Sequence, residues 1–296
     1  MPSKLRASHK APCNSSAPRE WFRDGFDDLY PALYQHRDRR EALQFASRWP
    51  VWKVLPEQGW CLDLGCGSGR YASVIAERGW KVVGIDLSKT MLERAARDTR
   101  NVSNVYFLRA DLRALPLKPY NSGCNIYSAQ DGSDPLLKCS IPDVKTLRFS
   151  DFHLAVSLFT SFGYFDDDVE HLKMLKQVAA LMQPGGVVVL DLPNIGDVMR
   201  HSTSDAGRRR QVGEYSIMES YHFDNERRRI EKYIEVRTDN QNRRYYESVR
   251  IWTSDELLRM TAAAGFTPVV PLWGSYSGEP LRGDSERMIY FGKYIG

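Results

Sequence analysis

The sequence predicts an α/β fold in which helices cover both faces of a mostly parallel sheet. Between Trp60 and Leu190, short apolar runs alternate with stretches of helical periodicity, the pattern of repeated strand and helix units. A Pro-Gly-Gly at 184–186 stops a helix and opens a fully apolar strand. A chain of 296 residues, 42% of them hydrophobic, can bury the core that such a fold needs.

Composition narrows the class of protein. A net charge of +4 is slight for this length, so no strong field for nucleic acid or membrane is expected. The five cysteines are odd in number and form no Cys-x-x-Cys pair, which favours a reduced, cytoplasmic setting. We find no apolar run near 18 residues and expect no membrane span. Residues 1–19 are basic and rich in Ser and Pro, and we expect a disordered tail there rather than a transit peptide.

Residues 20–296 are expected to form one domain that begins with a helical cap and continues into the core. The cap, residues 20–58, has apolar residues at helical spacing and is expected to hold two or three helices, with Pro31 and Pro50 as breaks. The core, residues 59–195, is expected to contain strands at 60–64, 81–85, 105–108, 152–158 and 187–190, and helices at 71–78, 89–97 and 169–182.

Three later segments depart from this alternation or complete it. Residues 114–149 are rich in turn formers and lack a period, so we expect an insertion that could act as a lid. Within 196–252 apolar residues alternate at period two, which predicts a small antiparallel sheet. In 253–296, the C-terminal end of the core, Ser254 is expected to cap a helix that Gly265 ends, followed by strands near 267–272 and 287–293.

The glycines in the turn after the first strand point to a ligand. Gly65, Gly67 and Gly69 permit positive φ and let a ligand lie against the backbone at a helix N-terminus. A dinucleotide fingerprint would need another glycine where Arg70 stands, which disfavours a nicotinamide oxidoreductase. The Gly-Lys-Ser/Thr of a P-loop is also missing from this turn.

Acidic residues near the ends of the first three strands indicate what the ligand carries. Asp63, just before the glycines, would repel phosphate and attract a cation. Asp86 ends the second strand, where a carboxylate can accept hydrogen bonds from two ribose hydroxyls. Asp111 follows the third strand, near the expected place of an adenine amino group. Together they predict a nucleoside with a cationic group and no phosphate.

Five ordered segments resemble the class I S-adenosylmethionine-dependent methyltransferases. The matching segments are 63–69 (DLGCGSG), 84–88 (GIDLS) with Met91 and Leu92, 110–112 (ADL), 152–165 (FHLAVSLFTSFGYF) and 181–191 (LMQPGGVVVLD). Segments 21–40, 160–165 and 274–287 also look like a bacterial-type small-molecule subgroup with an extra antiparallel sheet. The resemblance implies a Rossmann-like seven-stranded, mostly parallel sheet whose last strand is antiparallel.

The resemblance also implies a cofactor, S-adenosyl-L-methionine, and the residues that would bind it. Tyr34 and Arg70 are candidates for the donor's carboxylate end, whereas Cys66 is expected to be a small filler rather than a nucleophile. The cofactor candidates are Asp63, Gly65, Cys66, Gly67, Gly69, Arg70, Asp86, Leu87, Met91, Asp111, Leu112, Ser157 and Tyr34.

Methyl transfer from a sulfonium is an in-line displacement, to which the protein contributes alignment and exclusion of water, and we assign no metal. Tyr164, after the fourth strand, and His36, in the cap, are candidates for a general base if the acceptor needs one. We expect a small-molecule nitrogen or oxygen acceptor, and nucleic acid is unlikely because the basic clusters of 200–250 are interleaved with acids. A methyltransferase for a macromolecule, or a regulatory protein that binds the cofactor without turnover, remain open.

Overall fold

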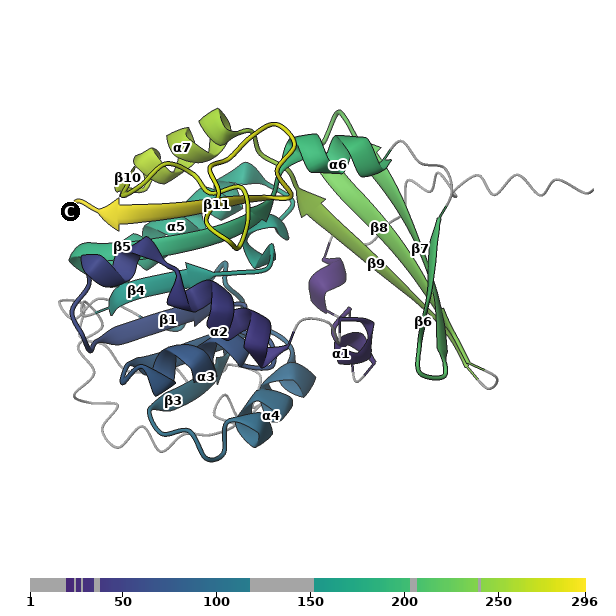
Figure 1. Ribbon diagram of the computed structural model, residues 1–296, viewed down its shortest axis with the longest axis horizontal. Coiled ribbons are helices and arrows are strands. Elements are labelled where there is room, and N and C mark those ends of the chain that lie inside the picture. The colour runs from purple at the N-terminus through teal and green to yellow at the C-terminus, as the bar shows by residue number, and fades with distance from the viewer. Residues whose placement is uncertain are drawn as a thin grey trace, which may run out of the picture.

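A computed structural model describes residues 20–23, 25–27, 29–34, 38–117, 152–202, 207–238 and 241–296 (Figure 1). Two sheets organise these residues. A seven-stranded sheet forms the core, and a four-stranded antiparallel sheet stands beside it. The predicted tail at 1–19 lies outside the described residues.

The core sheet has the predicted architecture. Its strand order is β10-β11-β5-β4-β1-β2-β3, and all pairs from β5 to β3 are parallel, whereas β11 pairs antiparallel with both β5 and β10. The strands are β1 (Trp60–Leu64), β2 (Lys81–Asp86), β3 (Val105–Arg109), β4 (Phe152–Ser157), β5 (Met182–Pro193), β10 (Phe266–Pro268) and β11 (Arg287–Tyr294). The central strands are apolar on both faces because each face is covered by helices.

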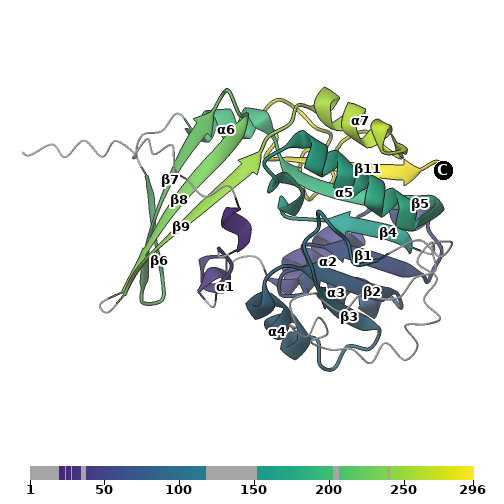
Figure 2. The same cartoon turned by 180° about the vertical axis from the view of Figure 1, so that it is seen from behind.

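Each face of this sheet packs against its own set of helices. On one face, α2 (Arg39–Ser47), α3 (Arg70–Glu77) and α4 (Lys89–Asp98) contribute to one hydrophobic core (Figure 1). On the other, α5 (Asp168–Leu181) and α7 (Ser254–Ala263) contribute to a second core (Figure 2). Helix α7 begins one residue earlier than expected from its cap: Thr253, not Ser254, caps it, in a capping box with Glu256.

The described residues of the N-terminal cap hold two α-helices, within the two or three predicted. These are the one-turn helix α1 (Tyr30–Leu33) and α2, and the cap also holds the 3-10 turns η1 (Trp21–Arg23) and η2 (Pro50–Lys53). Pro31 does not break a helix; it lies in the first turn of α1, where its missing N–H costs nothing. The apolar residues at the start of this region pack against the core and against the small sheet.

The small antiparallel sheet predicted within 196–252 is present and has four strands in the described residues. Its order is β6-β7-β8-β9, with β6 (Arg208–Val212), β7 (Tyr215–Asp224), β8 (Arg229–Arg237) and β9 (Asn242–Arg250). Strand β6 is not predicted by alternation of apolar residues, because its sequence, RRRQV, is almost entirely polar and lies at an exposed sheet edge. Helix α6 (Ile195–Ser202), also missed, connects β5 to this sheet.

Only residues 114–117 of the predicted insertion at 114–149 are described by the structure. Leu115 and Leu117 are buried in the core cluster, so this start of the segment belongs to the core. The rest, from 118 onward, lies outside the described residues, as does the lid predicted there.

The carboxyl ends of the parallel strands point toward the small sheet, and α1 lies between the two sheets (Figures 1 and 2). Ligand sites of open α/β sheets lie at this edge of the sheet.

Candidate functional site

The turn between β1 and α3 is built for close approach of a ligand. Gly65, Gly67 and Gly69 all have positive φ, at 71°, 53° and 76°. A Cβ on Gly65 would lie 2.6 Å from the side chain of Ser161, on the loop after β4. Glycine is therefore required here both for the backbone conformation and for the narrow gap between two loops.

Asp86, at the end of β2, is tied to this turn. Its carboxylate accepts a hydrogen bond of 2.8 Å from the Gly67 N–H and another of 2.8 Å from the Ser88 N–H. Burial raises the pKa of Asp86, and these N–H groups partly oppose the rise. The side chain is thereby fixed at the edge of the cavity, and each oxygen has a further lone pair for a ligand hydroxyl.

Asp63, at the end of β1, is less well paired than Asp86. It is 3% exposed, and its Oδ2 has no hydrogen-bond partner among the described residues. Burial, with the charge of Asp86 added, raises the pKa of Asp63 to about 7. A buried carboxyl oxygen without a partner is costly, and a cationic ligand would relieve that cost.

Asp111 lines the cavity but is already paired. It accepts hydrogen bonds from the Arg113 guanidinium, the shortest 2.6 Å, and Arg23 lies 3.4 Å away. Burial works to raise the pKa of Asp111, but the hydrogen bonds and charge of Arg113 lower it on balance. Leu87, Met91 and Leu112 supply apolar surface in the same part of the cavity.

One stretch of the cavity wall is aromatic, and the sequence indicated only some of its residues. Tyr34 and Tyr164, which were singled out from the sequence, line the cavity together with Phe26, Tyr30 and Phe159. The rings pack on one another: Phe26 lies 4.6 Å from Tyr30, and Tyr30 lies 4.9 Å from Tyr34, between ring centroids. These residues come from the cap and from the loop after β4, so no single sequence motif predicts them as a group.

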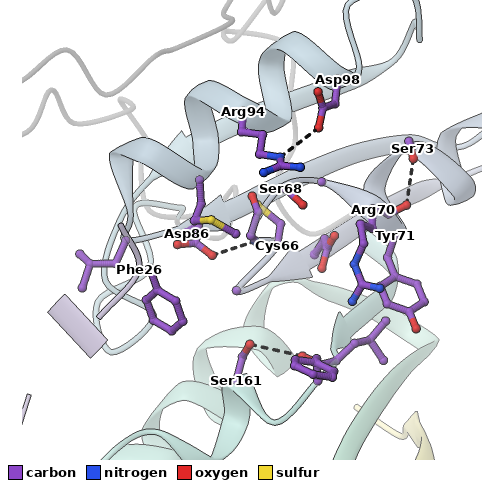
Figure 3. Close-up of a pocket in the computed structure, with 18 of the residues that line it drawn as sticks. Phe26, Cys66, Ser68, Arg70, Tyr71, Ser73, Asp86, Arg94, Asp98 and Ser161 are labelled. Carbon is purple, nitrogen blue, oxygen red and sulfur yellow. Dashed lines mark hydrogen bonds and ion pairs between the residues drawn. The ribbon is translucent and has the colours of Figure 1, made fainter. Parts of the chain in front are cut away.

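These walls enclose one cavity of about 530 Å³. Figure 3 shows Asp86 and Cys66 along one side, Ser161 on the side opposite, and Phe26 beyond Asp86. All the predicted cofactor residues except Ser157 line this cavity. Ser157 is fully buried, and its hydroxyl has no partner among the described residues. His36 lies outside the described residues.

Two predicted residues lie in the cavity with their polar groups engaged by the protein. Arg70 donates hydrogen bonds to the Glu41 carboxylate at 3.2 Å and to the Asp38 carbonyl at 3.4 Å. The Cys66 thiol is buried, which raises its pKa well above the usual range and disfavours a nucleophilic thiolate.

Asp191, at the end of β5, holds the loop that carries Phe159. Its carboxylate accepts from the Phe159 N–H at 2.9 Å and from Arg287 Nε at 2.8 Å, and its carbonyl accepts from the Thr160 N–H. Phe159 and Thr160 have φ of 61° and 67°, which is strained for residues with side chains. The sequence placed Asp191 in a family motif but did not indicate this role.

These features define a class of protein. A glycine turn without phosphate-binding residues, a carboxylate at the end of β2 and a buried carboxyl oxygen without a partner among the described residues fit S-adenosylmethionine. Asp86 would hold the ribose and Asp63 the cationic end, and the sulfonium of the bound cofactor supplies an activated methyl group. The chain thus has the fold and the site of a class I methyltransferase.

Comparison with known proteins agrees. Residues 34–270 match the model of the methyltransferase domain family, and the chain belongs to this family, whose cofactor is S-adenosylmethionine. A relative, the cypemycin N-terminal methyltransferase of Streptomyces sp, is 26% identical over 77% of this chain and 80% of its own length. The putative methyltransferase YqeM of Bacillus subtilis is 36% identical, but over only 31% of this chain and 35% of that protein.

Solved structures show the same fold. The methyltransferase CcbJ of Streptomyces caelestis aligns with a TM-score of 0.69 at 17% identity, over 95% of this chain and all of that chain. The sugar N-methyltransferase KedS8 of Streptoalloteichus sp aligns with a TM-score of 0.61 at 18% identity, over 97% of this chain and all of that chain.

The part of the chain that the structure describes holds neither a metal-binding cluster nor a membrane-spanning helix. No group of three or more His, Cys, Asp or Glu side chains there could hold a metal ion. No helix of that part is long and apolar enough to cross a membrane.

Proposed function

We propose that this protein transfers a methyl group from S-adenosylmethionine to a nitrogen or oxygen atom of a small molecule. One observation carries the proposal: the cavity of about 530 Å³ that holds the proposed donor-binding residues is also lined by aromatic side chains from the cap and from the loop after β4. Cavities of about 300–1,000 Å³ suit small ligands. Tyr30 of α1 lines the cavity, and α1 packs against the small sheet, a cover that suits an enclosed acceptor better than a long strand of nucleic acid.

In this proposal the chain's contribution is alignment and exclusion of water. Asp86 and the glycine turn hold the nucleoside, Asp63 faces the cationic end, and Leu87, Met91 and Leu112 pack against the base, which Asp111 borders. Arg70 stands near the donor's carboxylate end. Tyr164 lies on the aromatic stretch of the wall, where the acceptor would approach for in-line attack.

The names of two relatives support a nitrogen acceptor. One is called an N-terminal methyltransferase and another a sugar N-methyltransferase. Both names describe those proteins, so the nitrogen preference for this chain is part of the proposal.

The test is transfer of isotope-labelled methyl from S-adenosylmethionine to a panel of small amines and alcohols, with RNA and protein fractions in parallel. We expect label in one or more small molecules, and none in the RNA or protein. Label in RNA or protein alone would assign the enzyme to macromolecules. Binding of S-adenosylmethionine with label in no fraction would favour a regulatory protein.

A further inference from the structure

The ring of Phe159, on the loop after β4, lies beside the two residues expected at the carboxylate end of the donor. The guanidinium carbon of Arg70 is 5.9 Å from the centre of the Phe159 ring. The Tyr34 ring also lies 5.9 Å from Phe159, between centroids, with the planes at 79°. All three side chains line the cavity. Phe159 therefore borders the place where the amino-acid end of S-adenosylmethionine would lie.

Both neighbours of Phe159 are held by partners of their own. The Tyr34 hydroxyl donates to Glu247 of β9, at 2.8 Å to Oε1 and 3.0 Å to Oε2, and accepts from Lys232 Nζ of β8 at 2.9 Å. Arg70 is held by its hydrogen bonds to Glu41 and Asp38. The place of the Phe159 ring between these residues therefore depends on what holds its own loop.

The backbone of this loop is held in a disfavoured conformation by Asp191. Phe159 and Thr160 are consecutive residues with positive φ, which side chains disfavour. Asp191 Oδ2 accepts from the Phe159 N–H at 2.9 Å, and the Asp191 carbonyl accepts from the Thr160 N–H at 3.0 Å. Asp191 is fully buried at the end of β5. One buried residue thus anchors both strained positions.

The carboxylate of Asp191 is fixed in turn by the C-terminal part of the chain. The Tyr276 hydroxyl donates to Oδ2 at 2.8 Å, and Arg287 Nε donates to Oδ1 at 2.8 Å. The Tyr276 ring packs on Phe45 of α2, with centroids 4.4 Å apart. Tyr276 and Phe159 therefore meet at one carboxylate oxygen, and Tyr276 can be altered while the Arg287 hydrogen bond to Oδ1 stays in place.

Resting on the proposed function, we infer that Asp191 and Tyr276 are positioning residues for the methyl donor. Neither side chain lines the cavity, and both act through the turn that carries Phe159. Phe159, held in this way, covers the amino-acid end of the donor and excludes water beside Arg70. Exclusion of water strengthens the attraction between a guanidinium and a carboxylate. The nucleoside end, assigned to Asp86 and the glycine turn, does not depend on this anchor.

The test is calorimetric titration with two thioethers that differ only at the amino-acid end. S-adenosylhomocysteine is the donor without its methyl group, and methylthioadenosine keeps the nucleoside and the sulfur but lacks the amino acid. We expect Tyr276→Phe to weaken binding of S-adenosylhomocysteine by about tenfold, the effect of losing one hydrogen bond to a charged group. Its affinity for methylthioadenosine should stay that of the wild type.

A double variant tests whether Tyr276 acts through the Phe159 ring. Phe159→Leu should itself weaken S-adenosylhomocysteine, and addition of Tyr276→Phe to it should weaken binding no further. Tyr246→Phe is the matched control, because the Tyr246 hydroxyl also donates to a carboxylate, that of Glu231 at 2.7 Å, outside the cavity lining. This control should change the affinity for neither thioether.

Three results would overturn the inference. They are unchanged binding in Tyr276→Phe, equal weakening of both thioethers, and additive losses in the double variant, the last two being signs of a general structural role. The wild type must bind S-adenosylhomocysteine, and failure to do so would reject both the inference and the proposed function. Methyl transfer to RNA or protein alone would reject the proposed acceptor and leave the inference standing, because the two thioethers report only on the donor site.

Discussion

Arg229 of the small sheet donates a hydrogen bond of 2.6 Å to the main-chain carbonyl of Phe165, on the loop after β4. It also donates to the Tyr164 carbonyl at 3.2 Å and to the Ser248 hydroxyl at 2.7 Å. The side chain is 1% exposed, and burial lowers its pKa. One buried guanidinium thus ties the small sheet to the loop that carries Tyr164.

We expect Arg229→Met to cost about 3 kcal/mol or more of unfolding free energy, because several hydrogen bonds from a charged group are lost and carbonyls remain unpaired. Urea unfolding checks this value. Arg237→Met, at the exposed end of the same strand, should change stability by no more than about 0.5 kcal/mol. Equal small losses in both variants would refute the role of Arg229.

Alanine variants of Gly65 and Gly213 distinguish two effects. One is backbone strain, and the other is the fit of S-adenosylmethionine against the glycine turn. Both glycines have positive φ, but a Cβ on Gly213 meets nothing within 4 Å, whereas a Cβ on Gly65 meets Ser161 at 2.6 Å. We expect backbone strain to lower the free energy of unfolding of each alanine variant by about 1–2 kcal/mol. Only Gly65→Ala should also weaken S-adenosylmethionine binding, by about tenfold or more, which corresponds to about 1.4 kcal/mol.

Calorimetric titration of the two variants distinguishes these effects. If Gly65→Ala binds the donor as tightly as Gly213→Ala does, the narrow gap between Gly65 and Ser161 does not contribute to donor binding.

Asp63 makes the stability of the unliganded protein depend on pH. Its pKa is about 7 in the fold and 3.8 as an ordinary side chain, so the folded state holds more protons than the unfolded state between these values. The unfolding free energy should therefore fall as pH rises from about 4 to about 7. Asp86, whose pKa is also raised, acts in the same direction.

Asp63→Asn should make this slope shallower, because the side chain can no longer ionise, and should weaken donor binding because the negative charge is lost. Urea unfolding at several pH values measures the slope, with Asp255→Asn, at an exposed position outside the cavity lining, as control. Identical slopes in wild type and Asp63→Asn would contradict the burial argument.

Local sequence patterns predicted the core sheet, because its strands are buried on both faces and its turns need glycine or proline. Strand β6 and the 3-10 turns of the cap could not be predicted in this way. The polar strand β6 is held by its partner β7, and the cap owes its shape to packing against distant segments. Both depend on contacts that no short window of sequence contains.

The residues of the site divide in the same way, into those that local sequence predicts and those that depend on the tertiary fold. Asp63 and Asp86 lie at the carboxyl ends of β1 and β2, and the glycine turn follows β1, so these residues could be placed at one sheet edge in advance. The pairing of Tyr34 with Glu247 joins residues 213 positions apart in the chain, and the role of Asp191 depends on the strained turn at Phe159 and Thr160. These relationships arise only from the tertiary fold.

The measurement that tests the central claim most directly is calorimetric titration of S-adenosylmethionine into the wild type, Asp86→Ala and Asp86→Asn, with Asp255→Ala, an exposed residue outside the cavity lining, as control. Circular dichroism verifies that each variant is folded. Loss of charge-assisted hydrogen bonds to the ribose should weaken binding by about 1.5–3 kcal/mol in both Asp86 variants and leave the control unchanged. Wild-type affinity in folded Asp86→Ala, or no binding by the wild type, would contradict the assignment of this cavity to the methyl donor.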